Sequence, residues 1–253
     1  MNGWEQTIAE AAKLRWKTVE IRSRGELSPD SFIPATVFSH HQLDLQEGED
    51  TVWRAFRSST QRNIKKAGKE GVEASIFTSS DSIEDFYRLN CLTRKEHGLP
   101  PQPIKFFRKF YAHFLKAGKG FIVLATYRGK PIAANVFLRF GERAYYKYGA
   151  SDQKVQHLRA SNLVMWTGIQ HCLQTGIRSL CLGRTETENQ GLRQYKSGWG
   201  TSETTISYYK YDVVRRRFSR GKPAVVGWHN KVFKVLPIPA SRAIGSLLYK
   251  YMG

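Results

Sequence analysis

The spacing of apolar residues predicts a front region in which helices and short strands alternate. Residues 4–14 form an amphipathic stretch typical of a helix, and the runs KTVEIRS and ATVFSHHQLDL favour strands. Residues 51–69 predict a second amphipathic helix, which Gly71 ends. The face of that helix expected to be buried carries Trp53, Phe56, Thr60, Ile64 and Ala67. Further along, residues 72–77 predict a strand, and residues 82–97 and 103–116 predict helices separated by LPPQP.

From Gly120 onward the pattern becomes rich in strands. The runs FIVLATYR, PIAANVFLRF and AYYKYGAS, with turns at Gly129 and Gly141, predict consecutive antiparallel strands. A helix at residues 158–174 and a short strand at 178–182 follow, before a last helix and strand. We therefore expect residues 120–211 to form one mixed α/β domain with 178–182 as an interior strand, and the earlier half to pack against it.

The composition is that of a globular protein. The chain has 253 residues, of which 41% are hydrophobic and 13% aromatic, enough to bury a full core. Its three cysteines are Cys91, Cys172 and Cys181, and their spacing is not that of a metal or redox site. We therefore expect neither a disulfide framework nor a metal site, and we expect a reducing compartment. No apolar run approaches the roughly 18 residues of a membrane span, and the start lacks a signal-peptide pattern. These features predict a cytoplasmic location.

Positive charge changes the picture most. The chain carries 40 Lys and Arg against 21 Asp and Glu, a net charge of +19. Such an excess favours polyanionic partners such as RNA, phosphorylated sugar precursors or anionic lipid. The alternative is a solvated basic surface kept for solubility.

The end of the chain concentrates that charge. The last acidic residue is Asp212, and residues 213–253 contain nine basic residues. Beyond Pro237 and Pro239, apolar residues recur at helical spacing, which predicts a short helix with one apolar side. That helix would lie on an anionic membrane surface or pack back onto the domain. The apolar residues are Ile244, Leu247, Leu248 and Tyr251; the basic ones are Arg215, Arg216, Arg217, Arg220, Lys222, Lys231, Lys234, Arg242 and Lys250.

Several motifs of common enzyme classes are absent from the sequence. It has no GxxxxGK[ST], GxGxxG, HExxH or GxSxG, so P-loop nucleotide hydrolysis, classical dinucleotide chemistry and zinc proteolysis lose their usual support. The adjacent His40 and His41 would point to opposite faces of a strand and could not both bind one metal. We interpret them as structural or surface residues.

The stretch LGRTETENQGLRQYKSGWG, residues 182–200, combines a strand end, a polar loop, a short helix from about Asn189 and a Gly-Trp-Gly exit. With RNIKKAGKEGV (62–72) and YYKYGAS (145–151), it resembles the FemAB-like group of GNAT-fold transferases, including relatives from exopolysaccharide gene clusters. The resemblance covers nearly the whole chain.

This resemblance implies a mixed α/β fold of two GNAT-like halves. Residues 1–117 would be a first half that is incomplete at its front, because family members usually have a longer one. Residues 118–212 would be the second GNAT-like domain, followed by the basic amphipathic tail 213–253. The implied activity is transfer of an aminoacyl or acyl group to an amine of a peptidoglycan or polysaccharide precursor.

The resemblance also implies a catalytic residue. Lys196 matches the lysine of the family's aromatic-Lys motif, preceded here by Tyr195 and followed by Gly198 and Trp199. A fixed ammonium would stabilise the negative charge that acyl transfer builds on the carbonyl oxygen. We expect Lys196 at the floor of a cleft between the halves, near Tyr195 and Tyr148; the alternative is a surface lysine at a helix end.

Four further residues complete the predicted substrate site. Tyr146 and Tyr148 would orient substrate or relay a proton, although alternate tyrosines also suit packing. Arg94 and Arg184 would grip a carboxylate or phosphate, or else lie in solvent.

The acyl donor is left open between aminoacyl-tRNA and an acyl thioester. GNAT proteins that use acetyl-CoA typically have an R/Q-x-x-G-x-G/A loop opening a helix, where glycines let backbone amides approach the phosphates. The corresponding residues 156–163, QHLRASNL, contain no glycine. The missing glycine makes CoA a less favoured donor than charged tRNA or another thioester.

Three functions follow from these observations. The first is an aminoacyl or acyl transferase, which would be inactive if the chain is a fragment; the second is a polysaccharide N-acyltransferase. The third is a non-catalytic binding module for RNA or anionic lipid. An enclosed cleft around Lys196 would favour an enzyme, and a flat basic face would favour the module.

Overall fold

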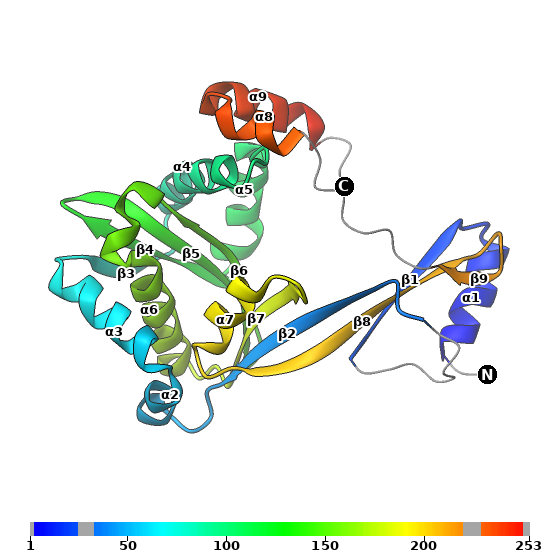
Figure 1. The fold of residues 1–253 in the computed structure, drawn as a ribbon, viewed down its shortest axis with the longest axis horizontal. Helices are drawn as coiled ribbons and strands as arrows, with labels where there is room; N and C mark the ends of the chain where they lie inside the picture. Colours follow the sequence, from blue (N-terminus) through cyan, green and yellow to red (C-terminus); the bar gives the residue numbers. More distant parts are fainter. Residues whose placement is uncertain (1–2, 25–32, 220–228, 250–253) are drawn as a thin grey trace. The chain divides into compact units, whose positions relative to one another are not determined.

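A computed structural model describes residues 3–24, 33–219 and 229–249 (Figure 1). The chain divides into two compact units, which we describe separately. Unit 1 comprises Met1–His41, Arg184–Ser197 and Thr201–Val225, and unit 2 comprises Gln42–Gly183, Gly198–Gly200 and Val226–Gly253.

Unit 1 is built on a small antiparallel sheet. Strand β1 pairs along its whole length with the second part of β8, from Thr18 opposite Asp212 to Arg24 opposite Ile206, and β9 pairs with the end of β8. Ala11, Val19 and Tyr209 are buried in this unit. Its elements are α1 (Gly3–Lys13), β1 (Thr18–Arg24), the first part of β2 (Thr36–Asp44), α7 (Gln190–Ser197), β8 (Ser202–Asp212) and β9 (Arg217–Ser219).

Unit 2 contains the strand-rich centre of the chain. Strands β4, β5 and β6 form an antiparallel meander, β3 pairs with β4, and β7 runs parallel to β6. The elements up to the meander are α2 (Glu49–Ala55), α3 (Ser58–Lys69), β3 (Glu73–Phe77), α4 (Ser80–Glu96) and α5 (Ile104–Phe110), followed by a π-helical turn (Tyr111–Leu115). The others are β4 (Gly120–Tyr127), β5 (Lys130–Phe140), β6 (Arg143–Ser151), a 3-10 turn (Gln153–Leu158), α6 (Ala160–Gln174), β7 (Ser179–Glu186), α8 (His229–Val235) and α9 (Ile238–Leu248).

Helices cover both faces of the unit 2 sheet, in agreement with a mixed α/β fold. On one side α4 and α5 pack with Phe86 and Phe107 against Val136 of β5. On the other side α6 approaches β5 so closely that a Cβ added at Gly168 would collide with the ring of Phe137. The described strands follow the order β1-β8-β2-β7-β6-β5-β4-β3, with β9 on β8. Strand β7 therefore lies inside a mixed sheet, as the sequence predicts.

The predicted helix at residues 51–69 is wrong in one respect, because it is two helices. Phe56 has an extended backbone with ψ of 140°, and Arg57 donates its N–H to Gly198 O at 3.0 Å. That bond replaces an intrahelical one and starts α3 anew. Four residues of the predicted buried face, Phe56, Thr60, Ile64 and Ala67, are buried, whereas the fifth, Trp53, is half-buried.

The end of the chain contains the predicted short helix, α9, preceded by α8. Both pack on α4. Arg220, Lys222, Lys250 and Tyr251, which were part of the predicted tail, lie outside the described residues. None of the described helices is long and apolar enough to cross a bilayer. The division into residues 1–117, 118–212 and 213–253, and the two GNAT-like halves, stay predictions.

Candidate functional site

Lys196 is a buried charged residue in unit 1. Its helix, α7, begins as predicted next to Asn189, whose Oδ1 accepts a hydrogen bond from Leu192 N at 3.1 Å. Only 4% of Lys196 is exposed, and its Nζ donates to the carbonyl oxygen of Arg184 at 3.1 Å. A buried ammonium is costly unless polar groups surround it. The alternative of a surface lysine at a helix end is therefore wrong.

A polar network lies on the same unit. Arg193 Nη2 is 2.8 Å from Glu203 Oε1, and His41 Nε2 is 3.4 Å from Glu203 Oε2. Burial lowers the pKa of His41, Glu203 counteracts this, and the charge of Lys196 lowers it further. A hydrogen bond from Ser39 is the main reason that the pKa of Glu203 is lowered. The network thus combines a neutral imidazole with an ionised carboxylate.

The histidine pair is structural, and the surface alternative is wrong. His40 and His41 are 5% and 0% exposed. His40 Nδ1 lies 3.5 Å from Thr204 Oγ1, whereas His41 lies near the preceding residue of β8, Glu203. The two rings therefore point to opposite faces, as expected. No group of three or more His, Cys, Asp or Glu among the described residues is placed to hold a metal ion.

Arg184 places its guanidinium in a stack of aromatic rings. Its Cζ lies 4.5 Å from the ring centre of Phe38 and 4.9 Å from that of Tyr208, and it donates to the Tyr208 hydroxyl. This stack lines a pocket of about 610 Å³ in unit 1, whose other charged residues are Arg22, Lys210 and Arg215 and the acidic Glu20 and Asp212. Arg184 thus contacts Lys196 through its backbone and a cationic pocket through its side chain.

The remaining residues of the aromatic-Lys motif have different surroundings. Tyr195 is half-buried on α7. Trp199, which belongs to unit 2, is fully buried and packs edge-on against Phe56 with ring centres 5.1 Å apart. The Gly-Trp-Gly exit is therefore a packing feature, and its Gly198 carbonyl starts α3.

A β-bulge at Lys147 separates the two predicted tyrosines in unit 2. Tyr148 pairs with Val136 and Tyr146 with Phe137, which leaves Lys147 without a partner in the register. Tyr148 packs with Phe107 on the α4–α5 side, whereas Tyr146 packs with Phe137 on the α6 side. Tyrosines two apart on a regular strand would share one face.

Tyr146 belongs to a polar spot that the sequence reasoning missed. Burial raises the pKa of Tyr146 to about 12, so its hydroxyl stays protonated at neutral pH. A Cβ added at Gly149 would collide with that hydroxyl and lie 3.1 Å from Asn135 Oδ1. Asn135 is buried, and its Nδ2 has no hydrogen-bond partner among the described residues. The signal in the sequence was one amide inside the apolar run IAANVFL.

Arg94 holds the end of the chain and is not a solvated surface residue. Its Nε donates to Pro100 O at 3.1 Å, and its Nη2 donates to the Tyr249 hydroxyl at 3.2 Å. Burial raises the pKa of Tyr148, Tyr249 adds to the rise, and Arg94 opposes it. Arg94, Tyr148 and Tyr249 are therefore close together in unit 2.

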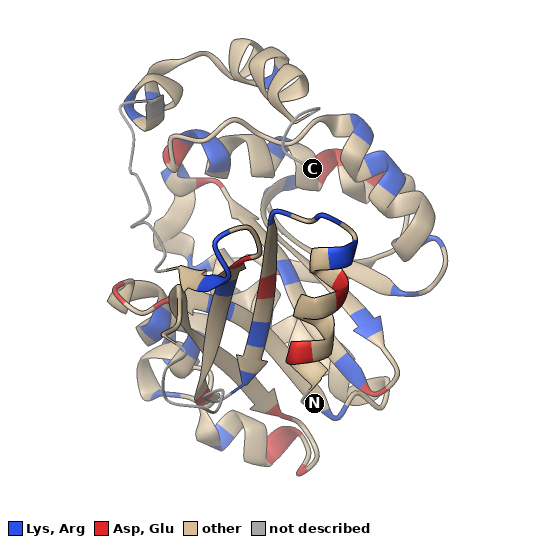
Figure 2. Ribbon diagram, turned by 90° about the vertical axis from the view of Figure 1, so that its right-hand side faces the viewer, with Lys and Arg blue, Asp and Glu red and all other residues tan. Residues whose placement is uncertain are grey.

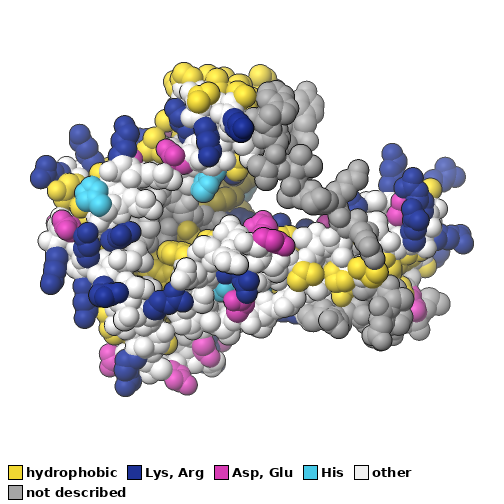
Figure 3. All heavy atoms as spheres, viewed as in Figure 1, with side chains coloured by type: hydrophobic (Ala, Val, Ile, Leu, Met, Phe, Trp, Pro, Cys, Tyr) yellow, Lys and Arg dark blue, Asp and Glu magenta, His cyan; other side chains and the backbone are white. Residues whose placement is uncertain are grey.

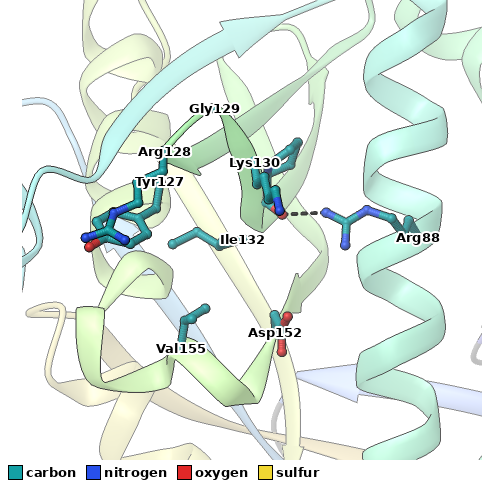
Figure 4. Close-up of a pocket in the computed structure, with 9 residues that line it drawn as sticks. Arg88, Tyr127, Arg128, Gly129, Lys130, Ile132, Asp152 and Val155 are labelled. Carbon is teal, nitrogen blue, oxygen red and sulfur yellow. Dashed lines mark hydrogen bonds between the residues drawn. The ribbon is translucent and has the colours of Figure 1, made fainter.

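A second cationic pocket, of about 450 Å³, lies at the β4–β5 turn of unit 2 (Figure 4). Arg88 reaches across from α4 and donates to Pro131 O, as the dashed line shows. The turn supplies Arg128, which has a positive φ of 50°, and Lys130. Asp152 is the pocket's acidic residue among those described. Such a pocket suits an anionic group, and the sequence reasoning did not single it out.

The start of α6 differs from the glycine-containing loop of acetyl-CoA-dependent GNAT proteins. Arg159 precedes the helix with φ of 60° and ψ of 24°, a left-handed conformation in which glycine is favoured. Strand β6 pairs with β7 only from Arg143 to Tyr145, although β6 continues to Ser151. The second half of β6, which leads toward α6, is therefore not paired with β7.

Comparison with known families identifies the fold. The model of the acetyltransferase (GNAT) domain matches residues 54–197, more than half of the chain. The chain belongs to the GNAT family. The matched residues include β4 to β7 and end directly after Lys196.

Individual relatives agree with the FemAB-like resemblance. UDP-N-acetylmuramoylpentapeptide-lysine N(6)-alanyltransferase of Weissella viridescens is 28% identical over 150 residues, which are 58% of this chain and 44% of that protein. The chain thus spans less than half of that relative's length. A crystal structure of FemX matches 81% of this chain and 75% of its own with a TM-score of 0.64 at 13% identity. A tandem GNAT protein from the clavulanic acid pathway matches 83% and 68%, with a TM-score of 0.52 at 10% identity. These two structures show the fold alone.

Proposed function

We propose that this GNAT protein transfers an aminoacyl or acyl group to an amine of a cell-wall or polysaccharide precursor. The observation that carries the proposal is Lys196, a charged residue that is 4% exposed and held at the end of β7 by Arg184 O. The Weissella relative is named as an alanyltransferase that acts on the lysine of UDP-N-acetylmuramoylpentapeptide, which supports an amine acceptor.

The proposed chemistry needs a fixed positive charge. The acceptor amine attacks the carbonyl carbon of the donor, a C–N bond forms, and the C–O or C–S bond to the donor breaks. One proton leaves the amine and one reaches the leaving oxygen or sulfur. In between, negative charge develops on the carbonyl oxygen, and Lys196 would stabilise this charge more than the ground state.

The other predicted residues would bind substrate. Arg184 and Tyr195 would act beside Lys196 in unit 1, and Arg94, Tyr146 and Tyr148 in unit 2. The protonated hydroxyl of Tyr146 suits a hydrogen-bond donor better than a base. We also propose two GNAT-like halves, residues 1–117 and 118–212, followed by the tail 213–253. We propose a cytoplasmic location.

Two donors fit the proposal. Aminoacyl-tRNA suits the net charge of +19, and an acyl thioester suits the GNAT family. The junction before α6, QHLRASNL, contains no glycine, which favours tRNA or a thioester other than CoA. A polysaccharide N-acyltransferase would use the same chemistry on a different amine.

A non-catalytic binding module for RNA or anionic lipid is the alternative, favoured by the nine basic and no acidic residues of 213–253. Mass spectrometry decides between these functions. The purified chain is incubated with alanyl-tRNA or acetyl-CoA and a lysine-containing muramyl-pentapeptide nucleotide or an amino-sugar oligomer. The expected product carries the added alanyl or acetyl mass. If no acceptor gains mass from either donor, the enzyme proposal fails and the binding module is favoured.

Lys196→Met tests the role of the ammonium, because it keeps most of the stem and removes the charge. We expect a fall of about 10² or more in rate with little change in melting temperature. Lys109→Met, at an exposed position of α5, is the control and should keep the wild-type rate. A wild-type rate for Lys196→Met would remove Lys196 from the mechanism.

A further inference from the structure

The last of the described helices, α9, turns part of its apolar side to the outside of the protein. Helix α9 buries Ser241 and Gly245, leaves Ile238 and Ile244 half-buried, and exposes Leu247 and Leu248. Pro239, Ala243 and Leu247 follow one another at four-residue spacing, and all three are exposed. Leu247 is 64% exposed and Leu248 is 41% exposed. A helix on a water-facing surface normally has the opposite arrangement, with its apolar stripe facing the core.

Close packing against unit 2 fixes this orientation. A Cβ added at Gly245 would collide with the carbonyl oxygen of Pro101, so the small face of α9 is in direct backbone contact with the LPPQP segment. A Cβ at Gly98 would likewise collide with the carbonyl of Asn230 in α8. Arg94 donates to the Tyr249 hydroxyl, and Arg242 stacks over Tyr87 at 5.1 Å. The apolar stripe therefore faces outward because the other face is held.

Helix α8 extends the apolar surface. Val232 is 40% exposed and Val235 is 78% exposed, and they lie three residues apart on one helical face. Figure 3 shows hydrophobic side chains gathered over the α8–α9 region at the top of the view. We call the outward apolar residues of α8 and α9 the apolar edge; its members are Val232, Val235, Pro239, Ala243, Leu247 and Leu248.

Positive charge accompanies the apolar edge. Lys231 and Lys234 of α8 and Arg242 of α9 are exposed, and neither helix contains an acidic residue. The ribbons of α8 and α9 accordingly carry blue segments and no red ones in Figure 2. Exposed apolar side chains flanked by Lys and Arg are the composition of helices that lie in the interface of an anionic bilayer.

We propose that the apolar edge of α8 and α9 is a docking surface for an anionic lipid bilayer. The helices would lie in the plane of the surface, with Leu247 and Val235 inserted among the headgroups and upper acyl chains. Lys231 and Lys234 would contact lipid phosphates. The proposal is independent of the acyl transfer proposed above, because none of these residues belongs to the proposed catalytic machinery.

Flotation with lipid vesicles tests the proposal on the full chain. We expect binding to vesicles of phosphatidylcholine mixed with phosphatidylglycerol, much weaker binding to phosphatidylcholine alone, and a loss of affinity as salt increases. Leu247→Ser should weaken binding about tenfold, because the bilayer then buries one large apolar side chain fewer. Lys231→Gln and Lys234→Gln should each weaken it about fivefold.

Matched variants separate the surface from general stickiness. Phe140→Ser removes an apolar side chain that is 81% exposed at the β5–β6 turn, and it should leave binding unchanged. Val235→Ser repeats the Leu247 test on the other helix in case one variant folds poorly, as judged by circular dichroism.

Three results would overturn the proposal. The first is absence of binding to the anionic vesicles, and the second is equal binding by wild type, Leu247→Ser and Val235→Ser. The third is that the protein self-associates in sedimentation experiments, that Leu247→Ser abolishes this self-association, and that vesicle binding is absent. The apolar edge would then be an interface between two copies of the chain. Acyl transfer to a water-soluble acceptor should be the same in Leu247→Ser and wild type, so the two proposals fail independently.

Discussion

Helices α7 and α9 are both short, and each departs from the usual rule for a surface helix, in which polar residues face water and apolar residues face the core. Helix α7 buries the charged Lys196 and exposes Leu192 to 37%, whereas α9 buries Ser241 and Gly245 and exposes Leu247 to 64%. A buried charge is retained only where polar groups meet it, and an exposed apolar stripe is costly unless something covers it. The first departure indicates chemistry within the protein, and the second indicates an interaction outside it.

Charge substitution at the two helices should give the largest difference. Lys196→Glu would bury a carboxylate against the carbonyl oxygen of Arg184, and we expect a loss of about 3–5 kcal/mol in the free energy of unfolding. Ser246→Glu, at an exposed position of α9, should change it by less than about 0.5 kcal/mol. Urea denaturation measures both. Equal, small effects would mean that Lys196 reaches water, and the contrast between the helices would disappear.

Glycine substitution should give a smaller difference with opposite signs. Gly245→Ala on α9 places a methyl group against Pro101 O, and we expect a loss of about 1–3 kcal/mol. Gly191→Ala on α7 meets nothing within 4 Å and should stabilise the helix by roughly 0.5–1 kcal/mol. Thermal unfolding of the two variants beside wild type checks the signs. A neutral Gly245→Ala would show that α9 can shift away from the LPPQP segment.

The smallest expected effect is a pH dependence of the free energy of unfolding. The polar network that includes Arg193 of α7 should contribute to it, and α9 should not. The pKa of His41 lies below its ordinary 6.5, mainly because of burial. As the pH falls from about 7 to 5, the unfolded chain takes up this proton first, so the free energy of unfolding should decrease. His40 and His171, whose pKa values burial also lowers, act in the same direction.

Urea denaturation at several pH values measures this slope. His41→Gln should flatten it, whereas Leu247→Ser should leave it unchanged, because α9 contains no histidine, aspartate or glutamate. An unchanged slope for His41→Gln would mean that His41 is not the source. Below about pH 4.5 the lowered pKa of Glu203 should cause a further loss of stability.

Much of the local structure could be predicted because short-range rules decide it. The short apolar runs FIVLATYR and PIAANVFLRF, bounded by turns, predicted β4 and β5, and Gly71 follows α3 in a left-handed conformation with φ of 77°. The position of Lys196 on a short helix and the family itself were also accessible, because the motif around residues 182–200 is a local pattern. These features need no knowledge of what the chain packs against.

Long-range packing decided the rest. The carbonyl of Gly198 interrupts the helix expected at 51–69, although the two are far apart in the sequence. The bulge at Lys147 sends Tyr146 and Tyr148 to opposite faces, and nothing in YYKYGAS specifies that extra residue. Likewise the network of His41, Arg193 and Glu203 joins three separate segments.

Helix α9 shows the division most clearly. The sequence by itself determined that residues near 238–248 form a helix with an apolar side, because helical periodicity is a property of the segment. Only the tertiary structure decided which side faces the protein. The backbone of Pro101 approaches so closely that only the small face with Gly245 fits, and this turns Leu247 outward.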